Sequence, residues 1–356
     1  MNNIAIFGYG TVGKGVYELT KNNPLFKVAA IFDKPEKKEE LHNLLVTDID
    51  SIILDKSIDT VVECLGGDSL PHEVIIKSLK NKKNVVTSNK ETISKHLSEY
   101  LRLANENQVS IQFEASVGGG IPLIYPLTIQ SDFDEIFEVK GILNGTSNFI
   151  LTKMSDEKMD KNEAIKLAQE KGFAEKDPTA DLEGIDMVRK GCILASLITK
   201  KEIHNEDILH FGISNLNASM IAEVASRGKV LKLITDIKVS DKGTSVIVLP
   251  VAIDKNSPLA QVKNEYNGVL ILGKYQEPLT FIGKGAGKNP TASAIVSDLV
   301  RINKKIAYPY PDLKPYYPLT SDLKGKYLLF SKESLKEVND PTEQELKAAM
   351  FIARVE

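Results

Sequence analysis

The chain has 356 residues, and at roughly 150 residues per domain this length predicts about two domains. Its 45 basic and 48 acidic side chains leave a net charge of −3. This charge argues against nucleic-acid or membrane-surface partners, because proteins that bind either of them usually carry a large excess of positive charge. Two distant cysteines, Cys64 and Cys192, argue against a disulfide framework, and without an apolar run of about 20 residues we expect a cytoplasmic protein with no membrane span.

Strands alternate with helices from residue 3 to about residue 115. Short apolar runs predict buried strands, and apolar residues at helical spacing predict the helices between them. The predicted strands span residues 3–7, 26–32, 61–65, 84–87 and 109–114, and the predicted helices span residues 12–22, 71–81 and 97–107. This alternation predicts an α/β fold with a doubly wound parallel sheet.

The chain changes character at Gly118-Gly119-Gly120-Ile121-Pro122, which cannot lie inside a helix and marks a domain junction. The later predicted strands span residues 136–143, 246–253, 268–275, 279–282 and 326–331, and later helices span residues 185–200, 290–302 and 342–354. We expect a first domain over residues 1–125 and an α+β domain over residues 126–289, with the helix at 290–302 returning to the first domain. Residues 306–356 form a C-terminal extension.

The segment Gly8-Tyr9-Gly10-Thr11-Val12-Gly13 has the pattern G-x-G-x-x-G directly after the first predicted strand. The first glycine permits a tight turn, the second lets the backbone approach a pyrophosphate, and the third lets helix and strand pack closely. The N-terminus of the following helix offers N–H groups and a positive dipole end to the anion. Asp33 follows 20 residues after the last glycine, where such a fold places an acidic residue. We therefore expect a Rossmann-type domain that binds a dinucleotide.

Two features near the second strand bear on the choice of dinucleotide. The Asp33 carboxylate can accept from a ribose 2′-hydroxyl and would repel a 2′-phosphate, which favours NAD. Lys34, Lys37 and Lys38 could instead hold the phosphate of NADP, and the same lysines are equally typical of a solvated loop. NAD and NADP are both compatible with these residues.

Two lysines stand where a polar substrate could bind. Ser88-Asn89-Lys90 follows the strand at 84–87, so Lys90 lies at the carboxyl edge of the sheet, where open α/β sheets bind ligands. A lysine there can stabilise a developing alkoxide, although most lysines are plain surface residues. Asp186 and Lys190 share one face of a helix, and an ordinary i,i+4 salt bridge is the simpler interpretation of their spacing. Residues 175–181 place three carboxylates in a proline-broken loop.

Asparagines and histidines give weaker signals. Asn144-Gly145 is compatible with a hairpin turn, and the N-glycosylation patterns at Asn144 and Asn217 are expected to be chance matches. The five histidines show neither metal-ligand spacing nor a triad pattern, so we assign them no role.

Six segments occur together over about residues 3–302. After the glycine turn come TSNKE at 87–91, EASVGGGIPLI at 114–124, GILNGTSNFIL at 141–151, GFAEKDPTADLEGIDMVRKGCILA at 172–195 and GKGAGKNPTASAIVSDL at 283–299. Jointly they resemble homoserine dehydrogenase, and the two long central segments are far more specific than the glycine turn. The resemblance implies a Rossmann domain with an α+β catalytic and dimerisation domain, a homodimer, and reversible NAD(P)-dependent reduction of L-aspartate 4-semialdehyde to L-homoserine.

The resemblance also implies roles for individual residues. Lys190 matches the catalytic acid–base lysine, and Lys90 matches a second lysine near the reacting oxygen. Glu175 and Asp186 match the carboxylates that hold the substrate. The residues matched to the cofactor site are Gly8, Gly10, Thr11, Val12, Gly13, Asp33, Ser88, Lys90, Gly172, Glu175 and Gly287. The residues matched to a sodium or potassium site, which uses mainly backbone carbonyls, are Glu114, Val117, Gly119 and Ile121.

These residue types suit the implied reaction. Carboxylates such as Glu175 and Asp186 can pair with the ammonium group of the substrate. A cationic lysine can stabilise the negative charge that builds on the aldehyde oxygen and then protonate that oxygen. In the reverse direction Lys190 must be neutral, and a contact with Asp186 would oppose that state. We therefore expect Asp186 to point at the substrate rather than to pair with Lys190.

The chain departs from the pattern of many relatives. Phe32 precedes Asp33 where many relatives carry an arginine that binds the 2′-phosphate, which weakens the case for NADP. The chain begins at the first strand, so no fused aspartate kinase is expected. Residues 306–356 are too few for a complete regulatory ACT module, so inhibition by threonine is not expected.

Two other functions fit part of the pattern. Aspartate-semialdehyde dehydrogenase needs a nucleophilic cysteine, and neither Cys64 on a predicted core strand nor Cys192 on an apolar helix suits that role. A non-catalytic NAD(P)-sensing protein would have no use for Lys90, Lys190 and Glu175 together.

Overall fold

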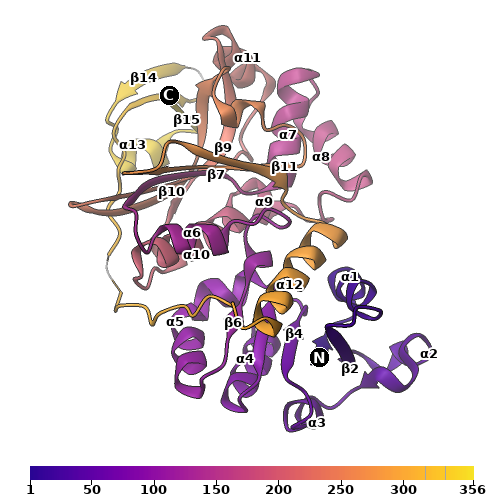
Figure 1. Cartoon of the computed structure of the whole chain (residues 1–356). Coiled ribbons are helices and arrows are strands. Elements are labelled where there is room, and N and C mark those ends of the chain that lie inside the picture. Colours follow the sequence, from indigo (N-terminus) through magenta and orange to yellow (C-terminus); the bar gives the residue numbers. More distant parts are fainter. Residues whose placement is uncertain (317, 333) are drawn as a thin grey trace. The chain divides into compact units, whose positions relative to one another are not determined.

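The computed structural model describes residues 1–316, 318–332 and 334–356. These residues form two compact units, each built from several segments of the chain (Figure 1). Unit 1 comprises residues 1–129, 200–202 and 286–316, and unit 2 comprises residues 130–199, residues 203–285 and the described part of 317–356. Within the described residues no helix is long and apolar enough to cross a membrane.

Unit 1 contains a six-stranded parallel sheet in the order β3-β2-β1-β4-β5-β6. Its strands are β1 (Asn2–Phe7), β2 (Phe26–Phe32), β3 (Leu45–Val46), β4 (Thr60–Glu63), β5 (Asn84–Thr87) and β6 (Ile111–Gln112). Its helices are α1 (Thr11–Thr20), α2 (Lys38–Leu41), α3 (Ile49–Ile53), α4 (Ser69–Lys80), α5 (Lys90–Asn107), α6 (Ile124–Gln130) and α12 (Lys288–Asn303). The strand order reverses between β1 and β4, which confirms the predicted Rossmann-type doubly wound sheet.

Both faces of this sheet are buried. Ile4 and Ile6 of β1 belong to the apolar cluster that includes α1 and α12, whereas Ala5 and Phe7 belong to the cluster on the opposite face with α3 and α4. A side chain at Gly15 on α1 would place its Cβ 2.9 Å from the Cβ of an alanine on α12, so glycine is what lets these two helices pack closely. Helix α12, far along the chain, thus belongs to unit 1 (Figure 1).

Unit 2 contains a nine-stranded mixed sheet in the order β12-β11-β7-β9-β10-β15-β13-β14, with β8 paired to β10. Its strands are β7 (Ile136–Ile142), β8 (Leu209–His210), β9 (Lys229–Ser240), β10 (Gly243–Asp254), β11 (Tyr266–Gly273), β12 (Leu279–Lys284), β13 (Lys326–Phe330), β14 (Leu335–Asn339) and β15 (Phe351–Val355). Its helices are α7 (Gly145–Asp156), α8 (Lys161–Glu170), α9 (Thr179–Leu182), α10 (Ile185–Thr199), α11 (Ala218–Ser226) and α13 (Glu343–Ala348).

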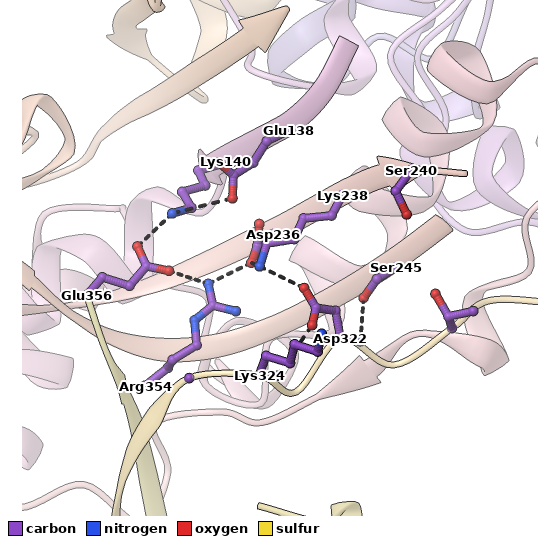
Figure 2. A network of polar contacts seen from close by, with 12 residues as sticks. Glu138, Lys140, Asp236, Lys238, Ser240, Ser245, Asp322, Lys324, Arg354 and Glu356 are labelled. Atoms are coloured by element: carbon purple, nitrogen blue, oxygen red, sulfur yellow. Dashed lines mark hydrogen bonds and ion pairs between the residues drawn. The ribbon is translucent and has the colours of Figure 1, made fainter. Parts of the chain in front are cut away.

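The prediction of one helix over residues 342–354 is wrong. Helix α13 ends at Ala348, and β15 enters the sheet between β10 and β13. The Arg354 guanidinium of β15 donates to the Asp236 carboxylate at 2.6 Å, and both side chains are buried (Figure 2). Hydrogen bonds to two neighbouring strands and this buried ion pair together favour an extended segment over another turn of helix.

Two further local predictions are corrected. The strand expected over residues 109–114 is limited to β6, because the chain turns into a short 3-10 helix at Glu114–Ser116. The hairpin turn considered at Asn144-Gly145 is instead a helix start, since Asn144 caps α7 by accepting from the Ser147 N–H at 2.8 Å. The long strand β9 and the helices α7 and α11 were not predicted.

Candidate active site

Three glycines shape the turn between β1 and α1 in unit 1. Gly8 has φ +95°, a conformation that favours glycine. A Cβ at Gly13 would lie only 1.9 Å from the Gly8 carbonyl oxygen, so the helix can start this close to the strand only with glycine there. A Cβ at Gly10, in contrast, would meet nothing within 4 Å. The turn is therefore packed on one side and open on the other, beside the first residues of α1, Thr11 and Val12, and it fits a pyrophosphate.

Asp33 stands at the end of β2 and is held by backbone groups. Its carboxylate accepts from the Tyr9 N–H at 2.5 Å and from the Lys34 N–H at 2.7 Å. Lys37 pairs with Glu40 at 3.4 Å, so one of the three lysines expected near a 2′-phosphate has an acidic partner. The geometry keeps a carboxylate next to the glycine turn, where a ribose hydroxyl could donate to it.

Phe32 is explained by packing. Its ring stacks on that of Phe7 with centroids 5.2 Å apart, in the apolar cluster beneath β1 and β2. An arginine at this position would lose that contact, so the aromatic residue serves the core of unit 1.

The segment that carries Lys90 is held by a buried carboxyl group. Glu63, the last residue of β4, is fully buried, and it accepts from the Leu65 N–H at 2.6 Å and from the Thr87 hydroxyl at 2.5 Å. The Thr87 hydroxyl oxygen in turn accepts from the Asn89 N–H at 2.9 Å, and Asn89 caps α5, whose first residue is Lys90. Burial raises the pKa of Glu63 to about 7. Lys90 itself is half-buried at the carboxyl end of β5.

Lys190 lies on α10 in a buried polar cluster of unit 2. Its ammonium donates to the Leu143 carbonyl at 2.6 Å and to the Asp186 carboxylate at 2.7 Å. The exposed fractions of the Lys190 and Asp186 side chains are 9% and 7%. The expectation that Asp186 would not pair with Lys190 is therefore wrong. The i,i+4 spacing puts both groups on one face, and a buried ammonium without water needs a carboxylate partner.

Asn144 and Asp181 belong to the same cluster, although neither was expected as a site residue. The Asn144 amide donates to Asp181 at 2.6 Å and to Asp186 at 3.0 Å. Burial raises the pKa of Asp181, and the charge of Asp186 raises it further. Asp181 comes from the loop with three carboxylates, whose composition was the available signal, whereas nothing local to Asn144 distinguished a bridge from a turn.

The remaining cofactor and substrate candidates are distributed over both units. Ser88 is half-buried in unit 1 and Gly287 is the N-cap of α12 with φ +114°. Gly172 and Glu175 belong to unit 2, where Gly172 has φ +74° just after α8. Glu175 is exposed, and its backbone carbonyl accepts from the Gln169 side chain at 3.1 Å.

Glu114 organises the segment expected to bind a monovalent cation. One of its carboxylate oxygens accepts from the Leu123 and Ile124 N–H groups, both at 2.7 Å, and the other accepts from the Tyr125 N–H at 2.9 Å. The carboxylate thus accepts hydrogen bonds from the N–H groups at the start of α6, which have no partner within the helix. Between Glu114 and α6, the positive φ of Gly119, +57°, turns the backbone that carries the carbonyls of Val117, Gly119 and Ile121.

Comparison with known proteins finds a matching family model for each of two long segments of the chain. Residues 8–114 match the family model "Homoserine dehydrogenase, NAD binding domain", and residues 122–300 match the family model "Homoserine dehydrogenase". A homoserine dehydrogenase of Synechocystis sp. is 38% identical over 314 residues, which cover 84% of this chain and 72% of the relative.

Solved structures agree. The structure of a homoserine dehydrogenase from Thiobacillus denitrificans has a TM-score of 0.85 at 31% identity, covering 93% of this chain and 83% of that one. A hyperthermophilic archaeal homoserine dehydrogenase in complex with NADPH has a TM-score of 0.75 at 26% identity, covering 88% of this chain and 99% of that one. The chain therefore belongs to the homoserine dehydrogenase family, NAD(P)-dependent oxidoreductases that reversibly reduce L-aspartate 4-semialdehyde to L-homoserine in the biosynthesis of threonine, methionine and isoleucine.

Proposed function

We propose that Lys190 is the general acid–base of this reaction and that Lys90 is the second lysine near the reacting oxygen. Asp186 and Glu175 hold the ammonium group of the substrate. The observation that carries this proposal is the buried Lys190 ammonium, fixed between the Leu143 carbonyl and Asp186. A lysine confined in this way has one orientation and little water to share its proton with.

The ion pair with Asp186 suits Lys190 to the acid direction. A neighbouring carboxylate favours the charged ammonium, which can stabilise and then protonate the oxygen of L-aspartate 4-semialdehyde. When bound, the nicotinamide supplies or accepts the hydride. For homoserine oxidation Lys190 must first lose its proton. A substrate ammonium that binds Asp186 competes with Lys190 for the same carboxylate, so substrate binding itself promotes the neutral lysine.

Asn144 and Asp181 position this carboxylate. The Asn144 amide donates to Asp186 Oδ2, the oxygen that Lys190 also contacts, and to Asp181 as well. Burial and the charge of Asp186 raise the pKa of Asp181, which the Asn144 amide holds close to Asp186. Asp181 thereby offers an additional acceptor for the substrate ammonium.

The cofactor contacts are proposed on the same basis. The turn formed by Gly8, Gly10, Thr11, Val12 and Gly13 holds the pyrophosphate, with its open side at Gly10. Asp33 accepts from the ribose, and Ser88, Lys90, Gly172, Glu175 and Gly287 complete the site. The backbone contacts that fix the Asp33 carboxylate near Tyr9 support its role as the ribose acceptor.

A sodium or potassium ion is proposed at the segment of Glu114, Val117, Gly119 and Ile121. The Glu114 carboxylate is taken up by three backbone N–H groups, so the ion is bound by the backbone carbonyls of the other three residues. Carbonyl oxygens are the ligands that hard cations prefer. The fixed start of α6 gives these carbonyls a rigid frame.

The acid–base role is tested by Lys190→Met, which keeps the length of the side chain. We expect kcat with L-homoserine and NAD(P) to fall by about 10²- to 10⁴-fold. Lys166→Met on α8, whose side chain is 78% exposed, is the matched control in the same unit. Near-normal turnover by Lys190→Met would remove the lysine from the mechanism. Unchanged dinucleotide affinity, measured by fluorescence titration, separates a chemical defect from misfolding.

The same assay tests the cation. Initial rates are measured with sodium, potassium or tetramethylammonium as the added cation, at constant ionic strength. Stimulation by sodium or potassium alone supports the carbonyl site, and equal rates with all three contradict it.

We further propose a cytoplasmic homodimer in which unit 1 binds the dinucleotide and unit 2 provides catalysis and dimerisation. The homodimer rests on likeness to the family, and the compartment is supported by Cys64 and Cys192, which form no disulfide in the described part of the chain. The molar mass of the purified chain from light scattering tests the dimer.

A further inference from the structure

Helices α4 and α5 of unit 1 bring together three side chains that the reaction does not use. These are His72 on α4 and His96 and Glu99 on α5, and one ligand atom from each lies within 4.8 Å of the others. The two imidazole rings have centroids 3.9 Å apart, and the His72 Nε2 lies 3.9 Å from a Glu99 oxygen. All three side chains are half-buried, so the cluster is organised by the helices and is also open to solvent.

We propose that His72, His96 and Glu99 bind a divalent transition-metal ion, Zn²⁺ in particular, that joins α4 to α5. Two imidazoles and one carboxylate are a donor set that zinc accepts, with water in the fourth position. Ligand atoms of a tetrahedral zinc site lie about 3.3 Å apart, given bonds of 2.0–2.2 Å. In the described structure these atoms lie within 4.8 Å of one another, so binding requires them to come closer by up to about 1.5 Å.

The surroundings of His72 prepare it as a ligand. Its Nδ1 lies 2.8 Å from the Tyr100 hydroxyl, which lies 2.5 Å from the Thr92 hydroxyl. When Nδ1–H donates to Tyr100 and Tyr100 donates to Thr92, the Nε2 lone pair faces Glu99. Hydrogen bonding at the far nitrogen is the usual way in which a protein fixes the tautomer of a metal-binding histidine.

His96 has an acceptor of the same kind. Its Nε2 lies 3.4 Å from Asp68 Oδ1, a buried oxygen with no hydrogen-bond partner among the described residues, while the other oxygen of Asp68 accepts from Lys95 at 2.9 Å. A metal on the Nδ1 of His96 would leave Nε2–H to donate to that oxygen. The metal-bound form of the cluster would fix the His96 tautomer whose Nε2–H faces this oxygen of Asp68.

Charge also favours an ion. Burial and the neighbouring His96 lower the pKa of His72. Asp68 and Glu99 contribute two negative charges beside the site, and Lys95 is already paired with Asp68. A divalent cation would therefore meet a net attraction from the groups that face it.

The proposal is tested by titrating the full chain, stripped with a chelator, with Zn²⁺ in a calorimeter and with Co²⁺ in a spectrophotometer. We expect one ion per chain at this site and a tetrahedral Co²⁺ absorption band that Zn²⁺ displaces. The double variant His72→Gln, His96→Gln should lose the band and bind at least tenfold more weakly, and His42→Gln, an exposed histidine of the same unit, should leave both unchanged.

Tyr100→Phe gives a second readout, because removing the hydrogen-bond partner of a ligating histidine weakens zinc sites by about 10- to 100-fold while all three ligands stay. Zinc should also raise the melting temperature of the wild-type chain and not that of the double variant. Failure of the wild type to bind Zn²⁺, or equal binding by the double variant with normal metal-free turnover of homoserine, would overturn the site.

Discussion

The two units make their functional sites from different materials. Unit 1 presents backbone: its glycine turn excludes every side chain at Gly13 and leaves Gly10 open. Unit 2 presents buried charge: Lys190, Asp186 and Asn144 satisfy one another where water is nearly absent. A site made of backbone depends on space, and a site made of side chains depends on hydrogen bonds, so the two should fail in different ways when altered.

The largest effect is expected in the backbone-built turn. Gly13→Ala would put a Cβ 1.9 Å from the Gly8 carbonyl oxygen, and neither backbone can move away while β1 and α1 stay packed. We expect the free energy of unfolding, measured by urea titration, to fall by about 4 kcal/mol or more, or the chain not to accumulate in folded form.

Gly10→Ala is the matched control for that prediction. Its Cβ has open space and its φ of −78° is accessible to alanine, so stability should be retained. The same methyl group would occupy the open side of the turn, and dinucleotide affinity should fall. Equal stability of the Gly13 and Gly10 variants would show that the turn does not depend on space as argued.

The next effect concerns the buried carboxyl group of Glu63, which holds the segment that carries Lys90. The pKa of Glu63 in the folded chain is about 7, above its ordinary value of 4.5. Between these two values the unfolded chain binds fewer protons than the folded chain, so stability falls as the pH rises through this window, by about 3 kcal/mol in total. Glu63→Gln, which cannot ionise, should remove that part of the slope in urea titrations between pH 4.5 and 7.

Asp298 contributes a slope of the same sign, since burial raises its pKa to about 7 as well, so the variant should keep part of the pH dependence. Glu73→Gln on α4, an exposed carboxylate of the same unit, should leave the slope unchanged. A wild-type chain whose stability rises with pH across this window would contradict the prediction.

The smallest effect concerns a residue of unit 2 that both caps a helix and donates hydrogen bonds to two carboxylates. Asn144→Ser keeps an acceptor for the Ser147 N–H and loses the amide that donates to Asp181 and Asp186. We expect the free energy of unfolding to fall by about 1–3 kcal/mol, because two buried carboxylates lose a donor, and kcat/KM for L-homoserine to fall about tenfold.

Asn217→Ser is its control, because Asn217 caps α11 in the same way and has no link to the cluster. Because serine is also a good N-cap, Asn217→Ser should keep the stability and kcat/KM of the wild-type chain. A loss of kcat/KM at Asn217 equal to that at Asn144 would mean that helix capping, and not the bridge, limits activity.

Sequence predicted unit 1 better than unit 2 for a physical reason. Strands of a parallel sheet buried on both faces are short apolar runs, and β2 and β5 were predicted to the residue, at 26–32 and 84–87. In unit 2 the strand β9 carries Lys232, Asp236 and Lys238, and its polarity hid it because their partners are distant in sequence: Lys232 donates to the Val262 carbonyl, and the other two form ion pairs. In β15 the partner of Arg354, Asp236, is likewise distant in sequence.

The site shows the same division. The spacing of the glycines in residues 8–13 predicts the geometry of the turn, because the turn is formed by residues that are adjacent in the chain. The partners of Asp186 depend on how β7, α9 and α10 pack, so the spacing of Asp186 and Lys190 by itself favoured an ordinary salt bridge over a catalytic pair. The cluster of His72, His96 and Glu99 was not predicted, because its side chains come from two helices, although Glu99 follows His96 at helical spacing.

The position of β15 has a consequence for biogenesis. The edge of β10 that it covers is complete once Asp254 has been made, but its neighbour begins only at Phe351. At roughly 5–20 residues per second, a ribosome takes about 5 to 20 seconds to cross that interval. For that time the part of the β10 edge around Val251 and Ala252 is open to pairing with other nascent chains, whereas Ile247 and Val248 on the same edge pair with β8. Slower translation of this stretch should therefore lower the yield of native enzyme, and a chaperone that shields strand edges should restore it.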